Sequence, residues 1–269
     1  MAKSTRNFSR WEKHDPTTWS LQIFHRYSSE LTSIWDAHIL SSRKVFSALG
    51  DSKANWEDLP SKHFVTRKVN WNKYKTLKDW SDAYNLFDNW VNLSAILTVA
   101  SNLETYLASV ISLSLESDPG VLVGATRSID GALILKHKRS GALKFSDAVT
   151  ACIKNDWSSR IDAFERIFGS CPPEYRAAHS DLEKLRSIRN RFGHAFGRDI
   201  ETARLHGTLK VLPMEKIPRQ SAQNLRETVI RVVKALDIFL LERHIGDFEA
   251  VRFYHNLYPA LHKSPSRNS

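Results

Sequence analysis

Apolar residues recur every three or four positions along most of the chain, a spacing that is typical of helices with one buried face. Few helix breakers interrupt the pattern, since the chain holds only ten glycines and nine prolines. We therefore predict an all-α fold, a helical bundle with an additional N-terminal helical layer. Its first helix begins after a capping Thr17 or Thr18 and ends at Gly50-Asp51. The predicted inner stripe of this helix is Leu21, Phe24, Leu31, Ile34, Trp35, Ile39, Val45, Phe46 and Leu49.

A second long helix is predicted at about 77–116, where Asp118-Pro119-Gly120 stops it, after a connection at 51–75 that holds one short turn. Residues 204–212 alternate weakly between apolar and polar positions, which is compatible with a small strand or hairpin. Further helices are predicted at about 121–135, 145–155, 157–168, 174–195 and 220–245, with a short one after Gly246. The expected division is an extension (1–75), a bundle (76–246) and a C-terminal short helix with a tail (247–269).

Tryptophan is concentrated in the N-terminal third, where seven of the eight lie at or before Trp90. One interpretation places Trp19, Trp35, Trp80 and Trp90 in the core of the additional helical layer. A second interpretation is that Trp71, Tyr74 and Trp80, which alternate with lysines, stack on unpaired bases.

The charge balance limits the class of partner. Lys and Arg number 39 against 29 Asp and Glu, which gives a formal net charge of +10 and a pI of about 9.6. A surplus of this size favours nucleic acid, an anionic membrane face or an acidic protein. Composition alone does not choose among these three.

The cysteine count and the N-terminus point to a cytoplasmic protein. Two cysteines, Cys152 and Cys171, exclude a disulfide scaffold and a zinc site built from cysteines. The basic N-terminus leads into charged residues and lacks the apolar core of a signal peptide. The least charged stretch, Asn89–Leu115, holds too much Asn, Ser and Thr for a bilayer span, so we expect no membrane segment.

Most known site patterns are absent from the sequence. It has no phosphate-binding glycine loop followed by Lys-Ser/Thr, no HExxH and no Gly-x-Ser-x-Gly. The eleven histidines are scattered, and no two lie at ligand spacing on one helix face. We therefore expect neither a metal nor a cofactor.

Basic residues are concentrated between Arg176 and Arg198. This run holds six basic residues, Arg176, Lys184, Arg186, Arg189, Arg191 and Arg198, and two acidic residues, Asp181 and Glu183. On a helical wheel, the apolar stripe of this run consists of Leu182, Leu185, Ile188 and Phe192. The neighbouring arc carries Arg186, Arg189, Asn190 and His194. The arrangement places one imidazole beside guanidinium groups on a face that the core does not use.

This set of groups suits cleavage of RNA, whose 2′-OH serves as an internal nucleophile without a metal. The reaction needs a general acid or base near neutral pH, for which histidine is suited, and fixed positive charge on the phosphate, which arginine supplies. The alternative is a solvated basic face with an incidental histidine near a helix end, where a cation is favourable in any case.

The motif Arg189-Asn190-x-x-x-His194 resembles the signature of the HEPN superfamily, and chance matches to it number about 0.04 per chain of this composition. Two other segments are similar to stand-alone HEPN proteins: Ser101–Leu107 within an apolar helix and Ile161–Gly169 before the motif helix. The resemblance covers about residues 77–245. HEPN proteins are α-helical bundles, and many are metal-independent endoribonucleases of toxin–antitoxin and defence systems.

The resemblance implies roles for individual residues. Arg189 and His194 would be the catalytic pair, with Asn190 in support. From the basic surroundings of the motif, we further expect Arg186, Arg191, Arg198 and Lys184 to bind the RNA backbone. The resemblance also implies a homodimer with two motif helices facing each other across a basic cleft, and an antitoxin or other regulatory partner. Members silenced by nucleotidyl transfer carry a Tyr two residues after the histidine. The chain has Phe196 there, which argues against that control.

Glu104 is an accessory candidate, because it is the only charge between Asn89 and Leu115. A buried carboxylate needs a partner, and Arg189 or Arg186 on the motif helix would supply one. A purely structural ion pair, or an exposed position for Glu104, is the alternative.

Two other function classes stay open. The chain could be a non-catalytic HEPN module that binds RNA or a protein partner and uses His194 only structurally. It could also be a helical adaptor whose N-terminal aromatic layer docks another protein.

Overall fold

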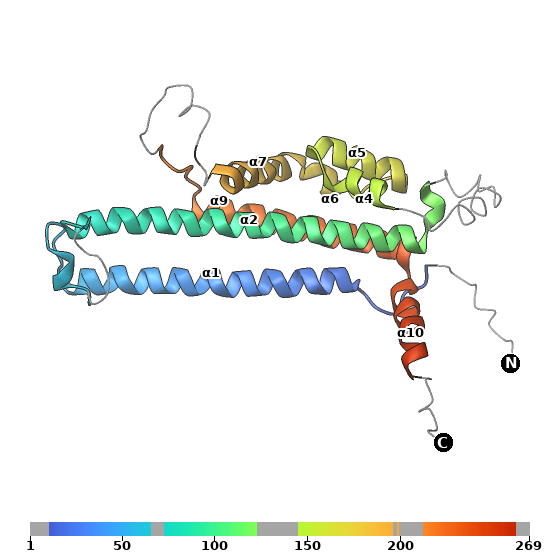
Figure 1. Ribbon diagram of the computed structural model, residues 1–269, viewed down its shortest axis with the longest axis horizontal. Helices are drawn as coiled ribbons and strands as arrows, with labels where there is room; N and C mark the ends of the chain where they lie inside the picture. Colours follow the sequence, from blue (N-terminus) through green and yellow to red (C-terminus); the bar gives the residue numbers. More distant parts are fainter. Residues whose placement is uncertain (1–10, 66–72, 123–144, 196–197, 199–211, 262–269) are drawn as a thin grey trace, which may run out of the picture. The chain divides into compact units, whose positions relative to one another are not determined.

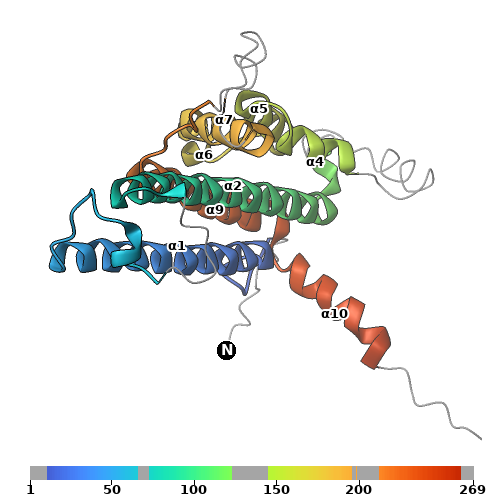
Figure 2. The same cartoon turned by 60° about the vertical axis from the view of Figure 1, so that its left-hand side comes forward.

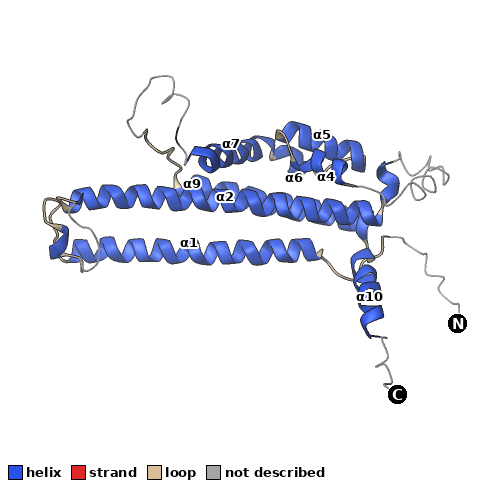
Figure 3. Ribbon diagram, viewed as in Figure 1, coloured by secondary structure: helices blue, strands red, loops and turns tan. Residues whose placement is uncertain are grey.

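The computed structural model describes residues 11–65, 73–122, 145–195, 198 and 212–261. Over these residues the protein is all-α, as the sequence predicts: they form helices and contain no strand (Figure 3). The α-helices are α1 (Trp19–Asp51), α2 (Leu77–Ser117), α4 (Ser146–Ile153), α5 (Trp157–Phe168), α6 (Pro173–Ala177), α7 (His179–Ala195), α9 (Arg219–Leu240) and α10 (Phe248–Leu261). Two short 3₁₀ helices (Pro60–Lys62 and Pro119–Leu122) and a π-helical turn (Leu241–Ile245) complete the described elements.

The chain forms two compact units. One contains Met1–His25, Leu103–Glu183 and Thr228–Ser269, and the other contains Arg26–Asn102 and Lys184–Glu227. The boundary crosses α1, α2, α7 and α9, so each of these helices contributes to both units. We call them the terminal unit, which holds both chain ends, and the motif unit, which holds Arg189 and Asn190.

In the motif unit, α1 and α2 run antiparallel beside each other (Figures 1 and 2). Buried Trp35 donates its indole N–H to Oδ1 of buried Asn92 at 3.1 Å. Asn102 donates to the Ser28 hydroxyl at 3.1 Å, one further step along the same pair of helices. These side-chain bonds fix the register of the helix pair, because each joins one residue of α1 to one residue of α2.

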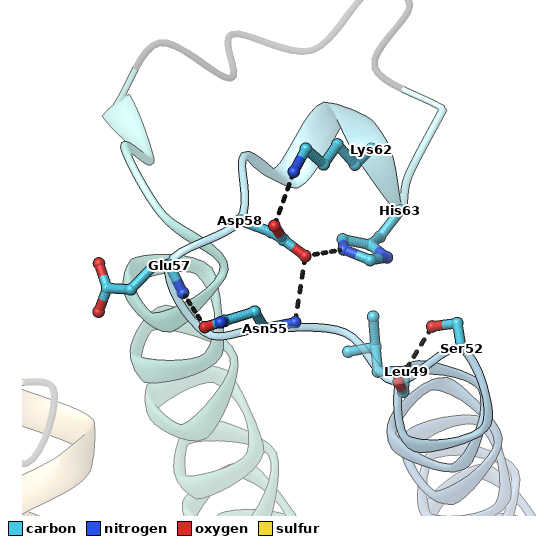
Figure 4. Close-up of polar contacts among 7 residues, drawn as sticks. All are labelled: Leu49, Ser52, Asn55, Glu57, Asp58, Lys62 and His63. Atoms are coloured by element: carbon cyan, nitrogen blue, oxygen red, sulfur yellow. Dashed lines mark hydrogen bonds and ion pairs between the residues drawn. The ribbon is translucent and has the colours of Figure 1, made fainter.

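The turn between α1 and α2 is held by one carboxylate (Figure 4). Asp58 accepts hydrogen bonds from the Asn55 backbone N–H at 3.1 Å, from Lys62 at 2.7 Å and from the His63 ring at 3.0 Å. These donors hold the pKa of Asp58 well below its usual range, with the Lys62 bond as the largest cause. The Asp58 carbonyl also accepts the Leu77 N–H at 2.7 Å, which ties the turn to the start of α2.

In the terminal unit, α1 begins on a shared polar cluster. Thr18 caps the helix by accepting the Leu21 N–H at 3.1 Å, which confirms the predicted cap. The Thr18 hydroxyl also donates to Oδ1 of Asp237 on α9 at 2.5 Å, and the Tyr106 hydroxyl donates to the same oxygen at 3.3 Å. Burial raises the pKa of Asp237 and outweighs these hydrogen bonds.

Helix α2 carries much of the core of both units. Its fully buried side chains include Leu93 and Ile96 in the motif unit and Leu107 and Ile111 in the terminal unit. By length and composition, α2 is the one described helix that meets the criteria for crossing a membrane, and half of its apolar stretch is buried inside the protein. Core helices of soluble proteins meet the same criteria, so the expectation of no membrane segment stays a prediction.

The structure also departs from the predicted elements. The helix expected at 174–195 is divided into α6 and α7 at Ala178, whose φ of −80° and ψ of 0° end α6. Ile34, predicted to face inward, is 62% exposed. Trp19 and Trp90 are 39% and 43% exposed and so are not core residues, whereas Trp35 is buried as expected. Most of the helix predicted at 121–135, and all but Leu212 of the strand predicted at 204–212, lie outside the described residues.

Candidate functional site

Helix α7 places the motif by burying one apolar stripe. Leu182, Leu185, Ile188 and Phe192 are between 0% and 8% exposed, which confirms the stripe predicted from the sequence. Because a helix turns by about 100° per residue, this burial fixes the direction of every other α7 side chain. Arg186, Arg189 and Asn190 accordingly lie on the half-buried flank of the helix, neither inside the core nor fully in solvent.

Arg189 and Asn190 contact each other directly. The guanidinium Nη1 of Arg189 donates to Oδ1 of Asn190 at 3.1 Å. This bond restricts the rotamers of a long side chain and leaves the carboxamide nitrogen of Asn190 as a donor. The guanidinium is thereby held in one orientation on the flank of α7, which is what binding of a tetrahedral or pentavalent phosphate requires.

His194 lies in the last turn of α7, and its side chain is outside the described part of the structure. Gly193 does not end the helix, which continues to Ala195. Lys184, two turns before Asn190, is exposed.

Arg191 and Arg198, both predicted to bind RNA, make contacts within the chain. Arg191 forms a bidentate ion pair with Glu215, with Nε–Oε2 at 2.8 Å and Nη2–Oε1 at 2.7 Å, and it also contacts the Ser187 hydroxyl. The Glu215 carboxylate raises the pKa of Arg191. Arg198 donates from Nε to the Leu212 carbonyl at 2.9 Å. The two arginines thus tie residues 212–215 to the last turns of α7 and to the chain that follows it.

The other side of this segment is held by α2. The Asn89 side chain donates to the Glu215 carbonyl at 2.7 Å and accepts the Ile217 N–H at 2.9 Å. A carboxamide that bonds two backbone groups two residues apart acts like a neighbouring strand. Ile217 itself is buried, 6% exposed. We call residues 212–217 the strap, because Arg191 binds it to α7, Arg198 binds it to the chain just after α7, and Asn89 binds it to α2.

Glu104 has a partner that sequence reasoning missed. It is 30% exposed rather than fully buried, and its Oε1 lies 3.6 Å from Nη2 of Arg160 on α5. Arg160 is 4% exposed, stacks over the Trp157 ring at 4.4 Å and donates from Nε to the Asn155 carbonyl at 3.0 Å. The sequence does contain a signal for this pair, because Arg160 occupies a position of the α5 apolar stripe between Trp157 and Phe164.

The described residues offer little for nucleophilic or metal chemistry. No three His, Cys, Asp or Glu side chains among them come together as a metal site would require. Burial raises the pKa of the Cys152 thiol to about 12 and that of Cys171 to about 11, so both thiols stay protonated at neutral pH. Neither cysteine is therefore poised as a nucleophile.

Comparison with protein-family models, curated proteins and solved structures finds no match to this chain. The residues that bear on function are therefore those of the chain itself: the motif on α7, the buried stripe that orients it and the contact between Arg189 and Asn190.

Proposed function

We propose that the protein is a metal-independent endoribonuclease of the HEPN type. The observation that carries the proposal is the placement of Arg189 and Asn190, which are bonded to each other on a half-exposed flank of α7 beside a fully buried stripe. The helix continues past His194, which is one turn beyond Asn190 on the same side of the wheel. The motif residues and the buried stripe that orients them therefore lie on the same helix, α7.

The chemistry proposed for these residues is transesterification. The RNA 2′-oxygen attacks the adjacent phosphorus and its proton passes to a base, while the 5′-oxygen leaves and accepts a proton. His194 serves in this proton transfer, and Arg189 stabilises the negative charge of the phosphorane. Asn190 is a positioning residue, because it accepts a hydrogen bond from Arg189 and holds the guanidinium toward the phosphate. The products are a 2′,3′-cyclic phosphate and a 5′-hydroxyl.

We propose that Lys184 and Arg186 supply the phosphate contacts beside this centre. Both lie on α7 outside its apolar stripe, Lys184 exposed and Arg186 half-buried. Arg191 and Arg198 already donate hydrogen bonds to the strap, to the Glu215 carboxylate and the Leu212 carbonyl. They can bind a phosphate through the same groups only if these hydrogen bonds break. The proposal retains the homodimer, the cytoplasmic location and an antitoxin or other regulatory partner as expectations from the resemblance.

The test uses the purified full-length chain with single-stranded RNA in EDTA. Wild type should produce 2′,3′-cyclic phosphate ends, and both Arg189→Ala and His194→Ala should abolish them without loss of helicity by circular dichroism. Arg43→Ala and His255→Ala serve as matched controls, because both residues are exposed and lie on other helices. Cleavage that persists in the Arg189→Ala/His194→Ala double variant would overturn the site.

A second candidate is the non-catalytic HEPN module, and one observation favours it. Two of the arginines expected to hold RNA are engaged within the chain, which leaves fewer cations for a substrate. Exposed aromatic side chains in the motif unit, Tyr27, Phe87 and Trp90, offer a surface for a protein partner instead. Salt-dependent RNA binding without new cyclic phosphate ends would favour an RNA-binding module. Protein binding without RNA affinity would favour an adaptor.

A further inference from the structure

A cavity of about 630 Å³ lies in the motif unit between the first half of α2 and the residues that lead into α9. Its α2 wall carries two carboxylates, Asp82 and Asp88, besides Asn85, Leu86 and Asn92. The other wall is formed by Lys216, Pro218 and Arg219. The volume is in the range of pockets that take small organic ligands. It is larger than a metal ion or a single phosphate needs. We call it the α2–α9 cavity.

Two carboxamides on the α2 wall supply donors and acceptors. Asn92 is 2% exposed, and its Oδ1 is already bonded to the Trp35 indole, which fixes the orientation of its carboxamide. Asn85 lies two turns earlier on the same wall and is exposed. Carboxamides pair with the edges of nucleobases, since each presents one donor group and one acceptor. Leu86 and Pro218 add apolar surface against which a flat ring can lie.

The opposite wall is cationic, and one of its donors is unused. Arg219 donates from Nη2 to Oδ1 of Asp88 at 2.8 Å, and the His38 ring bonds the same oxygen at 2.9 Å. Both carboxylates of the lining are matched by cationic or donor groups: Asp88 in this way, and Asp82 by an ion pair with Lys78. The Nε of Arg219 is buried and has no hydrogen-bond partner among the described residues. Lys216 is exposed at the rim. A phosphate group satisfies such donors.

The cavity is connected to the motif helix by a short path. Lys216 and Ile217 line it and follow directly after Glu215, whose carboxylate binds Arg191 on α7. Asn89 lines the cavity too and holds the same stretch of backbone from the α2 side. A ligand in the cavity therefore contacts the strap that is tied to the end of α7.

We propose that the α2–α9 cavity binds one unpaired nucleotide of the RNA strand, with the base toward Asn85 and Asn92 and the phosphate toward Lys216 and Arg219. The inference deepens the proposed ribonuclease function and rests on it for the identity of the polymer. The mixed lining favours a nucleotide over a purely apolar or purely anionic ligand, because both carboxamides and cations face the same space.

The test measures equilibrium binding of the four nucleoside 5′-monophosphates, with ribose 5-phosphate and inorganic phosphate as probes that lack a base. The variants are Asn85→Leu and Lys216→Met, both at exposed positions where the fold should tolerate the change. Asn256→Leu and Lys44→Met are matched controls at exposed positions on other helices. We expect at least one monophosphate to bind about tenfold more tightly than ribose 5-phosphate, and each cavity variant to lose about tenfold while the controls bind normally.

The outcomes separate this inference from the proposed function. Monophosphate binding that depends on Asn85 and Lys216 supports the inference even if no RNA is cut, in which case the ribonuclease proposal fails alone. Cleavage by wild type with an unchanged KM in both cavity variants overturns the inference and leaves the ribonuclease proposal standing. Equal affinity for inorganic phosphate and for the monophosphates overturns it as well, since the base would then contribute nothing.

Discussion

The ion pair between Arg191 and Glu215 gives a quantitative prediction about RNA binding. Glu215→Gln removes the carboxylate that holds the Arg191 guanidinium at 2.7 and 2.8 Å, and so releases one cation at the end of the motif helix. The pair is half in solvent, with Arg191 50% and Glu215 31% exposed. Exposed pairs contribute about 0.2–1 kcal/mol to stability, so the variant should lose no more than about 1 kcal/mol and stay folded.

The released arginine becomes available to a phosphate. Each additional phosphate contact on a single strand steepens the dependence of log K on log salt concentration by about 0.7. We therefore expect Glu215→Gln to bind single-stranded RNA more tightly at low salt, with the slope steeper by about this amount. Fluorescence anisotropy with a labelled oligonucleotide across a salt series of roughly 50–200 mM measures both quantities.

The control for this experiment is Glu57→Gln, which removes one negative charge from an exposed position in the α1–α2 turn (Figure 4). It changes the net charge equally but releases no cation on α7. A slope that steepens equally in both variants would assign the effect to net charge. An unchanged or shallower slope in Glu215→Gln would refute the reasoning that Arg191 is held back from RNA by the strap.

Three further predictions concern stability. Arg160→Met removes the ion pair with Glu104 and the stacking on Trp157, and should lower the free energy of unfolding in urea by about 2–4 kcal/mol. Exposed Arg166→Met should change it by less than about 0.5 kcal/mol, and equal effects would contradict a structural role for Arg160. Folding raises the pKa of Asp237, so wild type should lose stability relative to Asp237→Asn as pH rises above about 4. Urea midpoints of the two proteins that change in parallel with pH would contradict this. Folding lowers the pKa of Asp58, so Asp58→Asn should lower Tm at neutral pH. The difference in Tm from wild type should shrink as pH falls below about 4, and a difference that stays constant with pH would contradict this prediction.

Local patterns were enough to predict most elements and the face of the motif helix. The bounds of α1 and α2 agree with the periodicity to within two residues, because caps and breakers mark their ends in the sequence. The buried stripe of α7 follows from spacing alone. The break at Ala178 has no such marker, since alanine is the strongest helix former and neither Gly nor Pro stands there.

Contacts between distant residues were beyond the reach of the sequence. The basic run around Arg191 predicts a contact with RNA. No local pattern reveals that Glu215, 24 residues later in the chain, forms an ion pair with Arg191. Glu104 pairs with Arg160 of α5, a contact that no local pattern around Glu104 reveals. Ile34 continues an apolar spacing yet lies in solvent, because α1 is covered on fewer sides than a central helix. Sites that depend on tertiary pairing thus required the structure.

The central claim is that Arg189 and His194 cut RNA without a metal. The most direct measurement is analysis of RNA ends after incubation with purified protein in EDTA, for wild type and for the Arg189→Ala/His194→Ala double variant. We predict 2′,3′-cyclic phosphate ends with wild type and none with the double variant, whose helicity and RNA affinity should remain measurable. Intact RNA with folded wild-type protein across single-stranded and structured substrates, or cyclic phosphate ends from the double variant, would contradict the claim.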